Sequence, residues 1–430
     1  MAEYEAYKDS GAAWIGKIPT EWTVTRLKNH LRRTDARNPG GVQVLSLYRE
    51  LGIVPKDSRD DNHNVTSEDT SNYKYVQPGD FVVNKMKSWQ GSVAVSDYEG
   101  IVSPAYYVYK FLDEQFCKRY FHYLIRSCYK EEFMRLSAGI RIGQWDLPSQ
   151  DLDNVPVLIP TMVEQIAISE YLDRETERID VIIAEAKASI EEYKTWKASI
   201  IYEAVTKGLD PNVEMKDSGI EWFGMIPQHW LSMKLRYALE NISDVDHFMP
   251  ESVHEGISYI MIGDLKKLVS QIDIEGCKKI SMEDYRKLSQ KSKIQVDDVI
   301  FARYATIGTV SYVDVDIDCI ISYSCVVVSP KKDALSGKYL YYYLQSEAFA
   351  SEVGKYINTN IQGNVGKESI YKAKILLPPM AEQSVIVEYL DRRCQTVDSL
   401  IVEKEALIKD MEAYKKSLIF EVVTGKRKVV

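Results

Sequence analysis

Residues 159–183 read IPTMVEQIAISEYLDRETERIDVII, and residues 377–401 read LPPMAEQSVIVEYLDRRCQTVDSLI. The correspondence continues without a gap to Val205–Thr206 in the first copy and to Val423–Thr424 in the second. After its opening, neither copy contains proline or glycine up to this point. The sequence therefore predicts two long helices, which occupy residues 161–208 and 379–430.

Apolar residues recur in both helices at alternating spacings of four and three. Counted from Leu172 and from Leu390, eight of ten such positions are apolar in each copy. A heptad pattern of this length predicts a coiled-coil helix pair. The core of the predicted seam consists of Leu172, Ile179, Ile183, Ile190, Tyr193, Ile200, Leu390, Val397, Ile401, Ile408, Met411 and Leu418.

One seam position is a lysine in both copies, Lys197 in the first and Lys415 in the second. We favour a solvated lysine stem at each; the alternative is a polar residue that sets the helix register.

The order of segments predicts the direction of the second helix. The first helix ends near Gly208, where a second globular segment begins. The second helix leaves that segment near residue 380, so it must run back toward the first segment if the seams are to meet. We therefore expect antiparallel helices, with Thr424 near Lys8. The stretch from Leu172 to Ala204 would measure roughly 50 Å at the usual helical rise.

A second repeated stretch opens each globular segment. Residues 7–22 read YKDSGAAWIGKIPTEW, and residues 215–230 read MKDSGIEWFGMIPQHW. Gly and Pro in this opening cassette mark turns. Its large apolar side chains include Trp14, Trp22, Trp222 and Trp230. We favour a strap that packs each segment onto a helix end; the alternative is a docking surface that recruits two copies of one partner.

The segments between the cassettes are predicted to be mixed α/β. Runs rich in β-formers and bounded by Gly, Pro or Asp predict strands at Val42–Leu47, Asp80–Val83, Ser92–Val95, Ala105–Val108, Ser258–Ile262, Val299–Ala302, Thr309–Val313 and Cys319–Val328. Helix-like segments lie at Asp113–Ser127 and Gly337–Ser346. The expected fold class is α+β, with two mixed α/β domains separated by two long antiparallel coiled-coil helices in a pseudo-twofold internal repeat. The expected boundaries are 1–160 for the first domain, 161–208 for the central helix, 209–378 for the second domain and 379–430 for the last helix.

Composition indicates a soluble cytoplasmic protein. The chain has 430 residues, of which 45% are hydrophobic and 27% charged, and no apolar run is long enough for a membrane span. The amino-terminal residues lack the pattern of a secretory signal. The six cysteines form no C-x-x-C pair and the six histidines no cluster, so neither a zinc site nor another metal site is expected. The net charge of −9 argues mildly against nucleic acid, but the arrangement of charge matters more than its sum.

The motifs of common enzymes are absent. The closest approach to a phosphate-binding loop, around Gly363–Glu368, has the wrong spacing and lacks the hydroxyl after lysine. The only Pro-Pro pair lacks the flanking residues of an amino-methyltransferase site. We therefore expect no catalytic residues.

Polar loops at matching places in the two variable segments are candidates for DNA contact. Arg, Asn and Gln can read base edges, and Lys suits phosphate. The candidates are Lys85, Lys87, Trp89, Gln90, Arg141 and Gln144 in the first segment, and Arg303, Tyr304, Asn358, Asn360 and Gln362 in the second. For any one of them, a solvated loop without a partner is the competing interpretation.

The repeated text resembles the conserved regions of the specificity subunit of type I restriction–modification enzymes. The matching motifs are KDSG-x-x-W-x-G-x-IP-x-x-W and P-x-M-x-EQ-x-x-I-x-x-YLD, each present twice. The resemblance implies two target-recognition domains that read a bipartite, asymmetric sequence of double-stranded DNA with a fixed gap. It also implies binding of two modification subunits and of restriction subunits. S-adenosylmethionine, ATP and Mg²⁺ would then be bound by those partners and not by this chain.

Two readings of the duplicated layout compete. One is a DNA-sequence-recognition subunit, in which the helices set the gap between half-sites. The other is a two-domain scaffold that binds only proteins, which the negative net charge would suit. A standalone nuclease or methyltransferase is disfavoured by the missing motifs.

Overall fold

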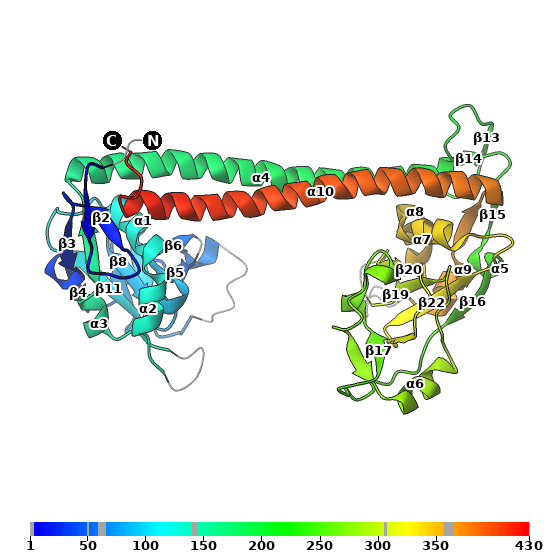
Figure 1. Cartoon of the computed structure of the whole chain (residues 1–430), viewed down its shortest axis with the longest axis horizontal. Coiled ribbons are helices and arrows are strands. Elements are labelled where there is room, and N and C mark those ends of the chain that lie inside the picture. Colours follow the sequence, from blue (N-terminus) through cyan, green and yellow to red (C-terminus); the bar gives the residue numbers. More distant parts are fainter. Residues whose placement is uncertain are drawn as a thin grey trace. The chain divides into compact units, whose positions relative to one another are not determined.

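The computed structural model describes residues 4–49, 51–58, 66–139, 145–304, 308–356 and 365–429. The chain divides into two compact units. Unit 1 comprises Met1–Ala186 and Ala406–Val430, and unit 2 comprises Lys187–Glu405. Each unit contains a globular part and a segment from each of the two long helices, as Figure 1 shows.

An antiparallel four-stranded sheet with the order β4-β11-β8-β9 lies at the centre of unit 1. Its strands are β4 (Leu31–Thr34), β8 (Phe81–Asn84), β9 (Val93–Val95) and β11 (Tyr106–Phe111). Four strand pairs accompany it: β1 (Tyr7–Asp9) with β2 (Lys17–Pro19), β3 (Thr23–Arg26) with β12 (Pro156–Ile159), β5 (Leu45–Tyr48) with β6 (Gly52–Pro55), and β7 (Lys74–Val76) with β10 (Gly100–Val102). The helices of the globular part are α1 (Lys118–Cys128), α2 (Lys130–Leu136) and α3 (Ser149–Asp153).

The core of unit 1 joins the sheet to the long helices. Phe81 of β8 and Phe121 of α1 belong to the same buried cluster as Leu172 and Leu418, which lie on the two long helices. The helix segments therefore belong to the hydrophobic core of the domain and are not only a connector. Burial of such large apolar side chains is the main favourable contribution to folding.

Unit 2 has a similar four-stranded sheet and a second sheet of three strands. The first has the order β16-β22-β19-β20, with strands β16 (Leu239–Ser243), β19 (Val299–Ala302), β20 (Val310–Tyr312) and β22 (Cys325–Pro330). In the second, β17 (Ile257–Ile260) lies between β18 (Lys278–Ile280) and β21 (Cys319–Ile321) and runs parallel to β21. The remaining pairs are β13 (Met215–Asp217) with β14 (Met225–Pro227), and β15 (Leu231–Lys234) with β23 (Lys374–Leu377). The helices of the globular part are α5 (Leu235–Ala238), α6 (Met282–Ser289), α7 (Gly337–Gln345), α8 (Glu347–Gly354) and α9 (Lys367–Lys372).

Two sequence expectations were wrong in detail. The run Cys319–Val328 forms two strands and not one, because the chain turns between β21 and β22 and passes from one sheet to the other. In that turn the backbone N–H of Cys325 donates to the carbonyl of Ser322 (2.9 Å). The helix-like segment that was expected from Asp113 begins only at Lys118. Its amino-terminal part is held by the Gln165 side chain, which accepts from the Cys117 N–H (2.8 Å).

The two long helices are confirmed. They are α4 (Met162–Lys207, 46 residues) and α10 (Met380–Val423, 44 residues). The two helices pack antiparallel within each unit. In unit 1 the Lys415 ammonium lies 2.6 Å from an oxygen of Asp180, and in unit 2 the Lys197 ammonium lies 2.9 Å from an oxygen of Asp398.

These two ion pairs are copies of one another, because Asp180 and Lys197 of the first sequence repeat correspond to Asp398 and Lys415 of the second. The interpretation of the two lysines as solvated stems is therefore wrong, and the structure favours a role in helix register.

The predicted seam residues line this packing. Leu172, Leu390, Val397 and Leu418 are at most 1% exposed. Four isoleucines on α4 are also buried: Ile179, Ile183, Ile190 and Ile200. The half-buried seam residues pack against the two main clusters: Tyr193 and Ile401 in unit 2, Ile408 and Met411 in unit 1.

The end of α10 meets the opening cassette of unit 1. Gly425 has a φ of +70°, and a Cβ at this position would lie 2.4 Å from Pro19 and 3.2 Å from Trp22. Gly208 ends α4 in the same manner in unit 2, with a φ of +73°, and a Cβ there would lie 3.1 Å from the Trp230 ring. Both helix ends thus need glycine for the left-handed conformation and for the close approach.

Candidate nucleic-acid interface

The candidate site of unit 1 lies where β8 ends. Lys85 follows the strand directly, and its ammonium lies 3.2 Å from Oδ2 of Asp146. The backbone links the same two segments, since the N–H of Leu147 donates to the carbonyl of Lys85 (3.0 Å). The other carboxylate oxygen of Asp146, Oδ1, is buried and has no hydrogen-bond partner among the residues that the structure describes.

Two tryptophans meet beside this pair. The ring of Trp89 lies 5.3 Å from that of Trp145, centroid to centroid, and its indole N–H donates to the carbonyl of Met86 (3.0 Å). The side-chain oxygen of Gln90 accepts from the guanidinium of Arg49, and Lys87 is exposed. The structure therefore brings four sequence candidates of unit 1 onto one turn. Arg141 and Gln144 lie outside the described residues.

The candidate site of unit 2 lies at the corresponding strand end. Arg303 follows β19, and its NH1 lies 2.9 Å from Oδ2 of Asp244. Lys367, the first residue of α9, binds the other oxygen of the same carboxylate at 2.7 Å. The Nε of Arg303 is buried and lacks a hydrogen-bond partner within the described part of the chain. Tyr304 is 44% exposed, with the Arg303 guanidinium 5.9 Å from its ring centroid.

Three further candidates of unit 2, Asn358, Asn360 and Gln362, fall in a segment outside the described residues. The two sites share one arrangement. A basic side chain at the end of a buried central strand is held by an aspartate from a distant segment, and one polar atom of the pair is left without a partner among the described residues. A buried polar atom without a partner costs free energy, which a ligand that supplied the missing hydrogen bond would recover.

Sequence reasoning missed the residues that hold these cations. Asp146 and Asp244 belong to no motif, and nothing in the local sequence ties Asp244 to Arg303. Lys367 lies in the stretch that resembles a phosphate-binding loop only in part, so the motif gave no reason to select it. Trp145 follows the candidate Gln144 directly in the sequence, but its contact with Trp89 depends on tertiary packing.

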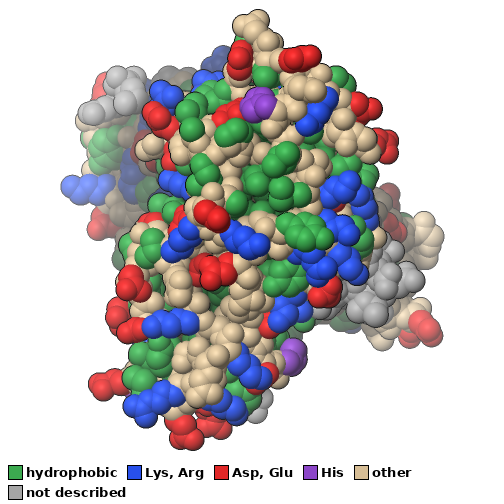
Figure 2. Space-filling view, turned by 90° about the vertical axis from the view of Figure 1, so that its right-hand side faces the viewer, with side chains coloured by type: hydrophobic (Ala, Val, Ile, Leu, Met, Phe, Trp, Pro, Cys, Tyr) green, Lys and Arg blue, Asp and Glu red, His purple; other side chains and the backbone are tan. Residues whose placement is uncertain are grey.

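The charge on the surface is uneven although the chain is acidic overall. Figure 2 shows a face of unit 2 on which lysine and arginine side chains gather on one flank, beside exposed apolar side chains. Such a local excess of positive charge is the property that matters for binding a polyanion. Among the described residues no group of histidine, cysteine and carboxylate side chains has the arrangement of a metal site. The described helices include none with the length and apolarity to span a membrane.

The opening cassettes pack onto the first turn of each long helix. The indole N–H of Trp22 donates to Oε1 of Glu164 (3.3 Å), and that of Trp230 donates to Oε1 of Glu382 (3.0 Å). Both indoles are fully buried. These are the contacts of a packing strap, whereas a contact of the cassettes with a partner stays a prediction.

The other two cassette tryptophans differ between the units. Trp222 donates to the buried carboxylate of Glu352 (3.0 Å), and the Lys355 ammonium lies 4.0 Å from the centroid of its ring. Trp14 packs against the ring of Tyr129, with centroids 6.1 Å apart. Its buried Nε1 makes no hydrogen bond to any described residue.

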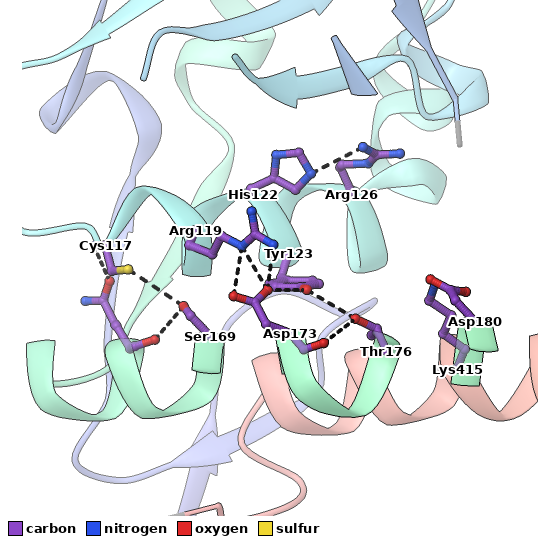
Figure 3. Close-up of polar contacts among 11 residues, drawn as sticks. Cys117, Arg119, His122, Tyr123, Arg126, Ser169, Asp173, Thr176, Asp180 and Lys415 are labelled. Carbon is purple, nitrogen blue, oxygen red and sulfur yellow. Dashed lines mark hydrogen bonds and ion pairs between the residues drawn. The ribbon is translucent and has the colours of Figure 1, made fainter. Parts of the chain in front are cut away.

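A polar cluster attaches each globular part to the long helices. In unit 1, Arg119 and Tyr123 of α1 both bind Asp173 of α4, at 2.8 and 2.7 Å (Figure 3). Figure 3 also shows Thr176 beside Tyr123, and Asp180 next to Lys415 of α10. Shallow clefts flank these contacts and the equivalent ones in unit 2.

The equivalent contacts in unit 2 are made by Lys338 and Tyr342 of α7, which bind Asp391 of α10 at 2.6 and 2.7 Å. Asp391 is the counterpart of Asp173 in the sequence repeat. Each globular part is thus attached to its helix segment by the same two kinds of contact, a basic side chain and a tyrosine hydroxyl that bind one aspartate.

Comparison with known proteins agrees with this architecture. The family model of the type I restriction modification DNA specificity domain matches residues 40–192 and 251–409. The MjaVIII specificity subunit of Methanocaldococcus jannaschii, a type I restriction enzyme subunit, is 23% identical over 96% of this chain and 94% of its own length. The EcoBI specificity subunit of Escherichia coli is 19% identical over 76% of this chain and 69% of its own.

Solved structures show the same fold. A chain from a structure on complex assembly and conformational transition of the type I R-M system superposes with a TM-score of 0.69 at 15% identity, over 95% of this chain and 99% of that one. The HsdS subunit from Thermoanaerobacter tengcongensis has a TM-score of 0.53 at 16% identity, over 95% and 98% of the two chains. Because the family model covers most of both units, the chain belongs to the type I restriction–modification DNA specificity family, whose members recognise DNA sequence and do not catalyse the reaction.

Proposed function

We propose that units 1 and 2 each read one half of a bipartite, asymmetric DNA target. One observation carries the proposal. In each unit a basic side chain at the end of a strand binds an aspartate from a distant segment, and one buried polar atom of that pair has no hydrogen-bond partner among the described residues. The folds of the two sites correspond, but their side chains differ. Similar domains with different reading groups are what an asymmetric target requires.

The chemistry of the two sites predicts different contacts. In unit 1, Oδ1 of Asp146 is an acceptor, which suits the amino group of cytosine or adenine in the major groove. In unit 2, the Nε of Arg303 is a donor held in place by Asp244, which suits the acceptors of guanine. The rings of Trp89 and Trp145 supply an apolar surface beside the first site. A well-formed bidentate contact discriminates between bases by about 1–3 kcal/mol.

We further propose that the helix pair α4–α10 sets the gap between the half-sites and docks two modification subunits. The duplication of the cassettes and of the clefts at Asp173 and Asp391 supports two equivalent docking places. S-adenosylmethionine would be bound by the modification subunits, and ATP and Mg²⁺ by restriction subunits of the same system. The assembly would act in the cytoplasm.

The test is to co-express the chain with the modification subunit of its own system and to map methylated bases across the genome. Arg303→Ala should relax the methylated motif at one half-site only, and Asp146→Ala, which removes the acceptor of unit 1, should relax it at the other. Lys118→Met, an exposed change at the start of α1, is the control and should leave the motif unchanged.

Two outcomes would contradict the proposal. One is a methylated motif without two separated halves. The other is a pair of variants that alter the same half-site, because each reading group lies in a different unit. The alternative of a scaffold that binds only proteins is not favoured, since the family match covers both units. A complex with all subunits present that does not bind DNA would support this alternative.

A further inference from the structure

A second group of basic side chains lies in unit 1, and the contacts described above do not use it. Arg33 lies on β4 and Lys74 on β7, and the chain between residues 34 and 38 pairs with the segment around Lys74. Arg37 lies opposite Lys74 in an antiparallel bridge.

The carboxylate of Asp35 is the ion-pair partner of two of these cations, at distances near the upper limit for a salt bridge. Oδ2 of Asp35 lies 3.9 Å from NH2 of Arg33, and its Oδ1 lies 4.0 Å from Nζ of Lys74. The Lys74 side chain is only 9% exposed, whereas that of Asp35 is 64% exposed. The buried ammonium is therefore paired weakly, with a carboxylate that remains largely in water.

Two of these cations, Lys74 and Arg33, lie near the aromatic ring of Tyr107. The Lys74 ammonium lies 5.5 Å and the Arg33 guanidinium 5.6 Å from its centroid. An aromatic face attracts a cation, but it supplies no neutralising charge. With Lys85 and its partner Asp146, the group holds four cations (Arg33, Arg37, Lys74, Lys85). Asp35, Asp146 and, near Tyr107, Asp153 supply three carboxylates, so that positive charge remains in excess.

Electrostatics within the group are unfavourable in the absence of a ligand. Burial lowers the pKa of Lys74, and the neighbouring charges of Arg33, Arg37 and Lys85 lower it further, against the opposing effect of Asp35. The charged form of Lys74 is thus held at a cost to the folded state. An anion placed among these groups would remove that cost.

We propose that Arg33 and Lys74, flanked by Arg37 and Lys85, bind a phosphate of the DNA backbone next to the half-site read by unit 1. The inference rests on the proposed function and adds a positioning contact to it. Lys85 links the two roles, because its ammonium binds Asp146 and its charge also acts on Lys74. In unit 2 the two basic side chains at the reading site bind their shared Asp244 at 2.9 and 2.7 Å, so their charge is compensated more closely.

A phosphate contact has a distinct experimental signature. Its loss weakens binding to all DNA sequences by a similar factor and lowers the slope of log affinity against log salt by about 1. Loss of a base contact instead weakens the target sequence selectively. The two kinds of contact are therefore separable in one titration series.

The experiment uses the full chain in complex with its modification subunits. Affinity is measured as a function of salt concentration for a duplex that carries the mapped target and for a scrambled duplex of equal length. Arg33→Gln and Lys74→Met should each lower the salt slope by about 1 and weaken both duplexes equally. Lys118→Met is the matched control, because this lysine also lies over an aromatic ring (Phe111, 5.9 Å) and should leave the slope unchanged.

A second readout distinguishes a binding role from a structural one. Without DNA, Lys74→Met should leave thermal stability unchanged or raise it, because it removes a buried and poorly compensated charge. A lower unfolding temperature would mean that Lys74 stabilises the fold. If Arg33→Gln also leaves the salt slope unchanged, the two results together overturn the inference.

Selective loss of the target duplex at an unchanged slope would also overturn the inference, because it would assign these residues to base reading. If the complex that carries no substitution does not distinguish the target from the scrambled duplex, the proposed function fails as well as this inference.

Discussion

At the scale of single residues, one glutamate in each repeat joins three parts of the fold. Glu164 accepts from the backbone N–H of Thr161 through one oxygen (3.3 Å) and from the indole of Trp22 through the other. Its counterpart Glu382 accepts from Trp230 and binds His229 (2.7 Å). The same carboxylate thus stabilises the start of a long helix and fixes the opening cassette on it.

We predict that Trp230→Phe destabilises the folded chain. The change keeps most of the apolar surface but leaves Glu382 without its indole donor, and hydrogen bonds to charged groups contribute about 1.5–3 kcal/mol. Urea unfolding of the full chain would measure the loss. Trp196→Phe, at a 40% exposed position on α4, is the control and should change the free energy of unfolding by less than about 0.5 kcal/mol. Equal effects of the two changes would contradict the importance of this hydrogen bond.

At the scale of elements, the ion pairs between α4 and α10 explain how two similar helices keep one register. Asp398 receives hydrogen bonds from both Lys197 and Lys267. Burial acts to raise the pKa of Asp398, but these hydrogen bonds outweigh it, and the pKa lies below its usual value of 3.8. A charged pair at a seam position disfavours alternative registers, in which either charge would face apolar residues.

We predict that Asp398→Asn costs about 1.5–3 kcal/mol of stability at neutral pH, because it removes the partner of a half-buried lysine. A carboxyl whose pKa is lower in the folded chain stabilises the fold above its unfolded pKa of about 3.8. This contribution is lost as the pH falls through the folded value. The difference between Asp398→Asn and the unmodified chain should therefore be full at pH 7 and shrink below about pH 4.

The matched control for this change is Lys194→Gln. This change breaks an exposed ion pair between Lys194 and Glu191, both on α4, which should contribute less than about 1 kcal/mol to stability. Unfolding midpoints measured between pH 3 and 8 would check both variants. A constant difference between Asp398→Asn and the unmodified chain at all pH values would show that the charge of Asp398 is not what stabilises the helix pair.

At the scale of the whole molecule, the division of labour follows from where the copies agree and differ. The repeated residues make the helix seam, the helix ends and the cassette contacts, whereas the strand-end sites at Lys85 and Arg303 have different partners in the two units. Change in the variable segments therefore leaves the shared scaffold intact.

We predict that lengthening both helices together changes the gap and not the half-sites. One heptad inserted into α4 after Ala186 and one into α10 after Glu405 keep the seam pattern and add roughly 10 Å of helix, which corresponds to about 3 base pairs. Mapping of methylated motifs should show the same two halves with a longer spacer. Altered halves with an unchanged spacer would contradict this role of the helices.

Much of the architecture was predictable because its signals are local. Heptad spacing and the absence of Pro and Gly predict the two long helices, and the order of the segments predicts their antiparallel direction. The repeated cassettes mark where each unit begins, and their resemblance to the type I specificity family predicts a subunit that recognises DNA. In each case neighbouring residues carry the information, since backbone conformation responds first to local sequence.

The ion pairs of the candidate sites could be identified only from the tertiary structure, because the residues of each pair are far apart in sequence. Arg303 and Asp244 are 59 residues apart, and Lys415 and Asp180 are 235 apart. No local pattern selects these carboxylates among the 63 acidic residues of the chain. The same is true of the break between β21 and β22, where the run Cys319–Val328 is divided between two sheets. The sequence alone determined the two long helices and that the chain is built twice; packing alone decided which charges meet, because contacts between distant segments depend on the fold as a whole.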